Sequence, residues 1–239
     1  MKNEYIPYPA VIEAIQTESF DTKTFKVRFK DKKVGKSFVY KPGQFVEISV
    51  LGAGEAPISI ASSPLRKRFL EFTIRAVGRL TRALHKLKAG EMIYIRGPYG
   101  NSFPYEEIKQ KNLYFVAGGI GLPPLRSLIK TVFDRRPDYG KIKILYGAKT
   151  PDEICFKEEL KAWKKIPDTE LLLTVDQPDD AWKENVGVVT TLWDKTDMDA
   201  SGSVAFVCGP LIMIKFSVQR LQQSGFKARD IYMSLERYM

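Results

Sequence analysis

The hydrophobic pattern changes character about 108 residues into the chain. Before that point, short runs of alternating apolar and polar residues predict β-strands at Phe25–Phe29, Phe45–Val50, Phe69–Arg75 and Met92–Arg96. Glycine- and proline-containing turns separate these runs, and one short helix is expected near Leu80–Leu87. Short strands at regular spacing favour an antiparallel β-barrel for residues 1–107.

Residues 108–239 instead alternate apolar strands with helical patterns. The expected strands are Leu113–Ala117, Ile142–Tyr146, Leu171–Val175, Val204–Val207 and Ile231–Leu235. The expected helices are Leu122–Phe133, Phe156–Lys164 and Leu211–Ser224, the last one ended by Gly225. Such alternation predicts a doubly wound α/β domain with a parallel sheet covered on both faces. We therefore expect two domains, residues 1–107 and 108–239.

The stretch from Leu113 to Pro124 carries the most specific signal. Its apolar strand ends in three glycines, and an amphipathic helix follows with two prolines in its first turn. Glycines let a backbone approach a ligand closely, and a helix N-terminus offers free N–H groups to a phosphate. The pattern is compatible with a dinucleotide site and equally with a plain strand–helix turn.

Charge and cysteine content narrow the function classes. The formal net charge of +10 suits anionic ligands such as dinucleotides, or an acidic partner. Basic residues are spread along the chain without a long block, so we do not expect nucleic-acid binding. The two cysteines, Cys155 and Cys208, cannot form an iron–sulfur site, and they indicate a reducing compartment. With a polar N-terminus and no apolar run near the ~20 residues of a membrane span, the protein is expected to be cytoplasmic.

Further stretches place polar residues and glycines at the ends of the expected strands. Glu55–Pro64 puts hydroxyls among apolar residues, which also suits a solvated edge strand. In Ile74–Thr81 an arginine, a glycine turn and a helix start suit a pyrophosphate or, alternatively, an ordinary capped helix. Tyr146–Thr150, Val175–Pro178 and Cys208–Pro210 end successive strands at one edge of the sheet, where open α/β sheets bind ligands. Without that context Cys208 would be an inert buried thiol.

Taken in order, these stretches resemble the ferredoxin–NADP reductase superfamily over nearly the whole chain. The resemblance rests on Pro57–Ser62, Arg75–Thr81, Gly97–Gly100, Gly118–Pro124 and Cys208-Gly209-Pro210. In particular, Ala56–Ile60 with Ser62-Ser63-Pro64, and Arg96–Asn101, resemble the gamma subunit of cytoplasmic sulfhydrogenases. The flavin subunit of anaerobic sulfite reductase and the electron-transfer subunit of dihydroorotate dehydrogenase are similar too.

The resemblance implies an NAD(P)H-oxidising or NAD(P)+-reducing flavoprotein subunit. Hydride would pass between nicotinamide and FAD, and single electrons to or from an iron–sulfur centre of a larger complex. Ser59 would lie near flavin N5, and Cys208 and Glu236 would flank the nicotinamide. The implied flavin-binding residues are Pro57, Ile58, Ser59, Ile60, Ile74, Arg75, Ala76, Gly78, Leu80, Thr81 and Tyr238. The implied dinucleotide-binding residues are Gly118, Gly119, Ile120, Gly121, Pro123, Tyr146, Gly147, Lys149, Asp176, Gly209, Pro210 and Met213.

Two departures from the family pattern qualify this picture. Ala56 and Ile58 stand where the superfamily usually has an arginine and an aromatic residue, so phosphate neutralisation must come from elsewhere, for example from Arg75. Ile231–Met239 resembles the stretch just before a four-cysteine [2Fe–2S] segment, so that cluster is expected only in a C-terminal segment absent from this sequence.

The sequence gives weaker signals for the coenzyme and for the partner than for the fold. Lys149 follows the second strand of the α/β domain, where a ribose 2′-phosphate would lie, and no acidic residue in Tyr146–Lys149 would bind a free 2′-hydroxyl. We therefore expect NADPH, with NADH as the alternative. The expected partners are iron–sulfur and hydrogenase or reductase subunits. Two alternatives remain: the electron-transfer subunit of dihydroorotate dehydrogenase, and a non-enzymatic scaffold without flavin.

Overall fold

A computed structural model describes residues 5–66 and 69–235. These residues form two compact units. Unit 1 contains the described residues through Phe103 together with Arg126–Thr131, and unit 2 contains the remaining described residues. Each unit has a hydrophobic core of its own.

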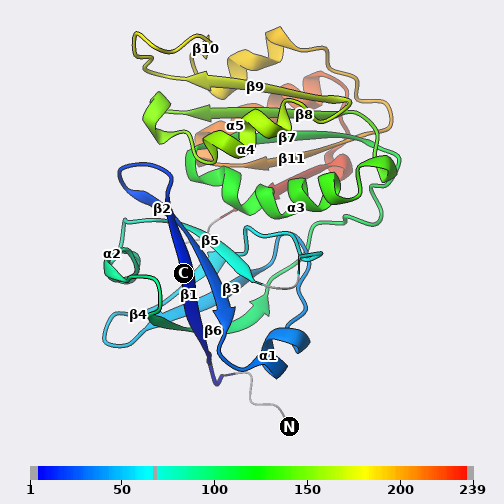
Figure 1. The fold of residues 1–239 in the computed structure, drawn as a ribbon. Helices are drawn as coiled ribbons and strands as arrows, with labels where there is room; N and C mark the ends of the chain where they lie inside the picture. Colours follow the sequence, from blue (N-terminus) through cyan, green and yellow to red (C-terminus); the bar gives the residue numbers. More distant parts are fainter. Residues whose placement is uncertain (1–4, 67–68, 236–239) are drawn as a thin grey trace. The chain divides into compact units, whose positions relative to one another are not determined.

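Unit 1 is a six-stranded antiparallel sheet in the order β4-β3-β6-β1-β2-β5 (Figure 1). Its strands are β1 (Tyr8–Thr17), β2 (Thr22–Phe29), β3 (Phe45–Val50), β4 (Gly54–Ser59), β5 (Leu70–Arg75) and β6 (Met92–Tyr99). Two short helices, α1 (Lys32–Ser37) and α2 (Arg79–Lys86), join strands. All four strands and the helix expected from the sequence are present, whereas β1 and α1 were not predicted.

Alternation along the strands builds the core of unit 1. Every second residue points inward, as for Phe25 and Val27 on β2 and Ile93 and Ile95 on β6. The edge strands β4 and β5 also approach each other, so the sheet curls into an open barrel around this core. Helix α2 packs against β3 and β4 and adds Leu80 and Leu84 to the core.

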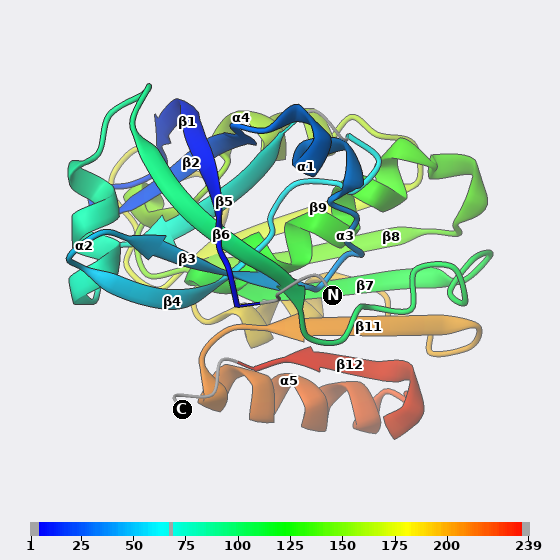
Figure 2. The ribbon, with the colours of Figure 1, turned by 90° about the horizontal axis from the view of Figure 1, so that it is seen from below.

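Unit 2 is a six-stranded parallel sheet in the order β10-β9-β8-β7-β11-β12. Figure 2 shows β8, β7, β11 and β12 of this sheet side by side. Its strands are β7 (Asn112–Gly118), β8 (Ile142–Ala148), β9 (Thr169–Val175), β10 (Asn185–Val186), β11 (Ser203–Cys208) and β12 (Ile231–Ser234). The helices are α3 (Leu122–Asp134), α4 (Lys157–Trp163) and α5 (Leu211–Gln223), with short 3-10 turns η1 (Gly119–Gly121), η2 (Arg136–Asp138), η3 (Pro151–Glu153), η4 (Val189–Lys195) and η5 (Ala228–Asp230). This confirms the predicted doubly wound α/β arrangement.

Two groups of helices pack on the sheet of unit 2. Tyr114 and Val116 of β7 pack in one cluster with Ile214 and Leu221 of α5 and with residues of η4. Helices α3 and α4 contact each other through Phe133 and Trp163, whose rings meet edge to face. Gly225 ends α5 as predicted: its φ is +94°, and its N–H donates to the carbonyl of Gln222. Within the described ranges, no helix is long and apolar enough to cross a membrane.

Candidate functional site

The strand order of unit 2 reverses direction at β7. Strands β8 and β9 lie on one side of β7, and β11 and β12 lie on the other. Ala117 of β7 pairs with Cys208 of β11, so the turns that follow these two strands leave the sheet side by side. Open α/β sheets bind ligands at such a switch point, outside the carboxyl ends of the strands.

Glycines allow the two turns to touch at this point. A Cβ on Gly121 would lie 2.2 Å from the carbonyl oxygen of Cys208, and a Cβ on Gly118 would lie 2.5 Å from Sδ of Met213. A Cβ on Gly119 would meet nothing within 4 Å, and its φ of +53° is a left-handed conformation that suits glycine. We call the turn Gly118–Gly121 with Cys208–Pro210 the glycine cradle. Its first turn runs directly into α3, whose leading N–H groups have no intrahelical acceptor.

Tyr146 holds the glycine cradle in place through a hydrogen bond to Gly119. Its side chain is completely buried, and its hydroxyl donates to the carbonyl of Gly119 at 3.2 Å. The same hydroxyl accepts the N–H of Cys155 at 3.2 Å. Because both bonds end on backbone groups, Tyr146 links the end of β8 to the turn after β7.

The other predicted residues of unit 2 lie at the ends of β8, β9 and β11 and at the start of α5. Gly147 packs closely on Val189, while the side chains of Lys149 and Asp176 are exposed. The carbonyl of Lys149 accepts the N–H of Gln177, which holds the two loops together. Pro210 caps α5, and Met213, one turn later, touches the cradle.

Cys208 is 5% exposed and is the last residue of β11. Its carbonyl faces Gly121, so its backbone helps to shape the cradle. Burial suits a structural thiol, whereas the position at the strand end suits a residue that contacts the coenzyme.

In unit 1, Ser59 is the final residue of β4 and is half-buried. On the same strand Ala56 and Ile58 pack against the core, while Pro57 is exposed. The segment Ile60–Ser63 that follows is pinned from both sides. Ile60 donates its N–H to the carbonyl of Gln44, and Ala61 donates to the carbonyl of Glu71.

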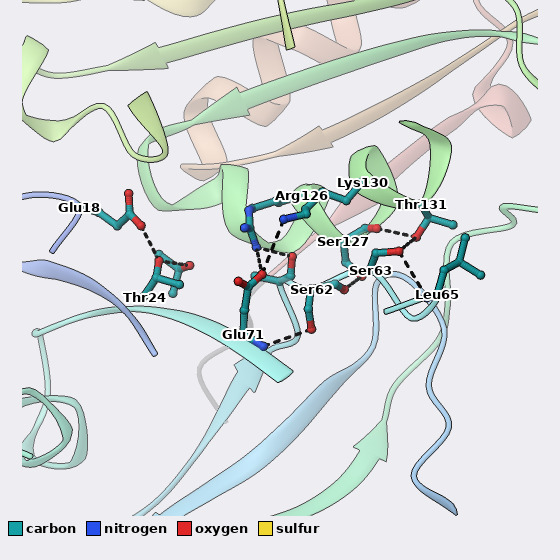
Figure 3. Close-up of polar contacts among 12 residues, drawn as sticks. Glu18, Thr24, Ser62, Ser63, Leu65, Glu71, Arg126, Ser127, Lys130 and Thr131 are labelled. Carbon is teal, nitrogen blue, oxygen red and sulfur yellow. Dashed lines mark hydrogen bonds and ion pairs between the residues drawn. The ribbon is translucent and has the colours of Figure 1, made fainter. Parts of the chain in front are cut away.

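Figure 3 shows the polar network that holds this segment within unit 1. Arg126 donates to the carbonyl of Ala61 at 2.9 Å and to the Glu71 carboxylate at 2.7 Å. Ser127 donates to the carbonyl of Ser62 at 2.7 Å, and the hydroxyl of Ser62 accepts the N–H of Glu71 at 3.1 Å. Two consecutive carbonyls shortly after Ser59, those of Ala61 and Ser62, are thus bound by neighbouring residues of one helical turn.

The charge of Arg126 is buried, since only 1% of the residue is exposed. A buried cation is tolerated because Glu71 pairs with it and the Ala61 carbonyl takes a further N–H. Lys130 lies 3.8 Å from the same carboxylate. Burial also raises the pKa of Tyr40, whose hydroxyl hydrogen-bonds to Ser62, so it stays a neutral phenol.

Arg75 and Thr81, predicted to hold a pyrophosphate, both have partners inside unit 1. Nε of Arg75 lies 2.6 Å from the carboxylate of Asp21. Burial opposes ionisation of Asp21, but hydrogen bonds from Arg75, Thr22 and Ser19 outweigh it and lower its pKa. The hydroxyl of Thr81 accepts the N–H groups of Val77 and Gly78 at 3.0 and 2.8 Å, which shapes the start of α2.

The side chains of several predicted flavin-site residues are buried and do not reach the surface. Ile60, Ile74 and Leu80 are buried in the core of unit 1, so only their backbone is available to a ligand. Ala76 donates its N–H to the carbonyl of Asp21. Glu236 and Tyr238 lie outside the described residues.

Sequence patterns did not identify four residues that shape unit 1: Asp21, Glu71, Arg79 and Arg126. Arg79 lies inside the predicted pyrophosphate stretch Arg75–Thr81, and its Nη2 donates to the carbonyl of Gly52 at 2.6 Å. The other three bind residues far away in the sequence: Asp21 binds Arg75, 54 positions away, and Glu71 binds Arg126, 55 positions away. No local sequence pattern reveals such pairs.

Two family models match the chain, one in each half. Residues 9–105 match an oxidoreductase FAD-binding domain, and residues 115–219 match an oxidoreductase NAD-binding domain. Among the relatives of this chain, the gamma subunit of sulfhydrogenase 2 from Pyrococcus furiosus is 39% identical, and the match covers 99% of this chain and 86% of that subunit. The gamma subunit of sulfhydrogenase 1 from the same organism is 34% identical, with coverage of 99% and 82%.

A probable dihydroorotate dehydrogenase electron-transfer subunit from Pyrococcus furiosus is 30% identical, and the match covers 84% of this chain and 70% of that subunit.

Solved structures share the fold at lower identity. The FAD/NAD-binding domain of a nitric oxide dioxygenase from Vibrio cholerae has a TM-score of 0.85 at 16% identity, covering 97% of this chain and 99% of that chain. A ferredoxin–NADP+ reductase from Neisseria gonorrhoeae has a TM-score of 0.78 at 18% identity, with coverage of 95% and 98%. The chain therefore belongs to the ferredoxin–NADP reductase superfamily, with an FAD-binding domain followed by an NAD-binding domain, and it is related to sulfhydrogenase gamma subunits and dihydroorotate dehydrogenase electron-transfer subunits.

Proposed function

We propose that the chain is a flavoprotein electron-transfer subunit that exchanges hydride equivalents with NAD(P)H and electrons with another subunit. The observation that carries this proposal is the glycine cradle at the switch point of unit 2. There a Cβ on Gly121 would collide with the backbone of Cys208 and one on Gly118 with the side chain of Met213, whereas the space beside Gly119 is open. Glycine backbone at the start of a helix suits a bound diphosphate, because its N–H groups can approach the phosphate oxygens without a side chain in between.

The residues of unit 2 suit a nicotinamide dinucleotide. The N–H groups of Gly119, Ile120 and Gly121 would hold the diphosphate, and Tyr146 keeps their turn in place through Gly119. Lys149, exposed at the end of β8, would bind the adenosine ribose. Cys208 would lie against the nicotinamide ring.

The residues of unit 1 suit a flavin at the edge strands β4 and β5. The start of α2 offers N–H groups, and no acidic residue occupies its first turn. Ser59 presents a hydroxyl from a strand end whose exit, Ile60–Ser63, is fastened by Arg126 and Ser127. When bound, FAD supplies the conversion between two-electron hydride chemistry and one-electron transfer.

This proposal is tested on the purified protein. The expected result is a yellow protein that releases FAD on denaturation and is bleached when NAD(P)H is added without oxygen. A colourless protein that takes up no FAD would instead support the flavin-free scaffold.

Preference for NADPH follows from the exposed ammonium of Lys149. Lys149→Ala should raise the KM for NADPH several-fold and leave the KM for NADH unchanged, because only NADPH carries a 2′-phosphate. Lys161→Ala, which removes an exposed ammonium from α4, is the matched control. Faster turnover with NADH than with NADPH in the parent protein would reject the preference.

Similarity to two sulfhydrogenase gamma subunits, at 39% and 34% identity over 99% of this chain, supports the other subunits of a sulfhydrogenase-type complex as partners. The 30% identity with a dihydroorotate dehydrogenase electron-transfer subunit supports a second candidate partner. Purification of the native complex from cell extract, followed by identification of its subunits, distinguishes the two.

A further inference from the structure

We propose that Arg79 is the residue that neutralises the diphosphate of FAD, in place of the arginine that β4 lacks. The inference rests on the proposed flavin-binding function and concerns how unit 1 provides the positive charge. It follows from four features of unit 1, which concern β4, Arg75, the start of α2 and Arg79 itself.

Strand β4 offers no cation to a phosphate. Ala56 packs against the core, and the one charged residue on the strand is the acidic Glu55. Arg96 of β6 binds that carboxylate with two nitrogens, at 2.9 Å from Nε and 2.5 Å from Nη2. The pair is internally neutral, so Arg96 does not supply the missing charge.

The charge of Arg75 is already compensated. Its Nε binds Asp21 at 2.6 Å, and the side chains of Ser19 and Thr22 bind the same carboxylate. The lowered pKa of Asp21 keeps this partner ionised near neutral pH. A phosphate would have to compete with an established ion pair for Arg75.

Arg79 has no such partner. It is the first residue of α2, and Nη2 donates to a neutral acceptor, the carbonyl of Gly52 in the turn between β3 and β4. Across the described part of the chain, no carboxylate lies within ion-pair distance of its guanidinium. One of the five N–H donors of the guanidinium is used by this bond, and the full positive charge remains available.

The position of Arg79 is electrostatically unfavourable unless an anion binds there. A helix N-terminus already carries partial positive charge, and a cation in the first turn adds to it. No acidic residue in the first turn of α2 offsets this charge. Arg79 also reaches the β3–β4 turn from α2, the helix that packs on β4, so its guanidinium lies beside the edge strand where the arginine is missing. A diphosphate satisfies both the helix start and Arg79.

The test compares ligand affinity with stability in the absence of ligand. Apoprotein is titrated with FAD and with riboflavin, which lacks phosphate, by quenching of flavin fluorescence. Thermal unfolding of each apoprotein is followed by circular dichroism. The variants are Arg79→Gln, Arg79→Lys and, as a charge-matched control at the other end of α2, Lys86→Gln.

Arg79→Gln should weaken FAD binding by about 10- to 100-fold, as expected for loss of a charge-assisted hydrogen bond. Arg79→Lys should keep part of the affinity, and Lys86→Gln should keep all of it. Riboflavin affinity and the unfolding temperature of the apoprotein should change little in all three variants.

Unaltered FAD affinity in Arg79→Gln overturns the proposal. So does an equal loss of FAD and riboflavin binding together with a lower unfolding temperature, because that pattern shows a structural clamp between α2 and the β3–β4 turn. A parent protein that binds neither flavin refutes the flavoprotein function itself, which is a distinct result.

Discussion

Replacement of Gly121 by alanine tests whether the glycine cradle must be free of side chains. Gly121 has φ −74° and ψ −15°, an ordinary conformation for alanine, so backbone strain does not enter. The added Cβ would lie 2.2 Å from the carbonyl oxygen and 2.5 Å from the carbonyl carbon of Cys208, and 2.7 Å from the nitrogen of Gly209. The obstacle is backbone on a buried strand end, which has no rotamer to change.

The cost follows from how far that backbone must retreat. Contacts of a Cβ shorter than 3.0 Å are essentially never found, so the turn after β11 must move by roughly 1 Å. Overpacking of a tight interior costs about 1–3 kcal/mol, and an unyielding backbone places Gly121→Ala near the upper end. For a chain of this length, about 3 kcal/mol corresponds to a fall in unfolding temperature of roughly 6–12 °C.

Thermal unfolding by circular dichroism without coenzyme measures this loss, and NAD(P)H titration measures binding. Gly119→Asn is the contrasting variant, because its Cβ would meet nothing within 4 Å and asparagine tolerates a left-handed conformation. We expect Gly119→Asn to unfold near the parent temperature yet to lose coenzyme affinity, since its side chain would enter the space proposed for the diphosphate. An unchanged unfolding temperature in Gly121→Ala would refute the packing argument.

Three further predictions concern other parts of the two sites. Tyr146→Phe should lower stability by about 1–3 kcal/mol and weaken NAD(P)H binding, because the buried N–H of Cys155 loses its acceptor and the carbonyl of Gly119 loses a donor; denaturant unfolding and coenzyme titration check this. Cys208→Ser should slow flavin reduction by NAD(P)H in stopped-flow measurements while FAD stays bound; an unchanged rate in folded protein would make Cys208 a core thiol. Asp21→Asn should flatten the acid side of the stability profile. The lowered pKa of Asp21 gives stability that is present above the unfolded value of about 3.9 and is lost as the pH falls through the folded value.

Sequence patterns predicted most of the fold because local periodicity decides most of it. Alternation of apolar residues marks β3, which begins and ends as expected at Phe45 and Val50, and the parallel strands read as continuous apolar runs. Strand β1 escaped prediction because Pro9, which lacks an N–H, interrupts the pattern near its start. Helix α1 has no buried residue, so it carries no apolar stripe to detect.

The site was predictable only where its residues are neighbours in sequence. The glycine turn Gly118–Gly121 and the strand end at Cys208 are local signals, and the structure brings them together at the switch point. The pairing of Arg75 with Asp21 joins residues 54 positions apart, so the sequence offered Arg75 as a free cation. The roles of the individual site residues stay predictions until the variants are measured.

The assignment of Arg126–Thr131 to unit 1 has a consequence for the order in which the protein folds during synthesis. Arg126 and its partner Glu71 are separated by 55 residues, so this bond closes a long loop. Until that part of α3 has left the ribosome, the carboxylate of Glu71 and the carbonyl of Ala61 lack the bonds from Arg126, and the carbonyl of Ser62 has only its bond from Tyr40. Domains often complete folding from the N-terminus as they emerge. The core of unit 1 is complete by Ile95, but its last segment arrives only after β7 and the glycine turn have been synthesised. In nascent chains that end near Phe103, unit 1 should therefore lack the bonds that Arg126 and Ser127 make to the Ala61–Ser62 segment.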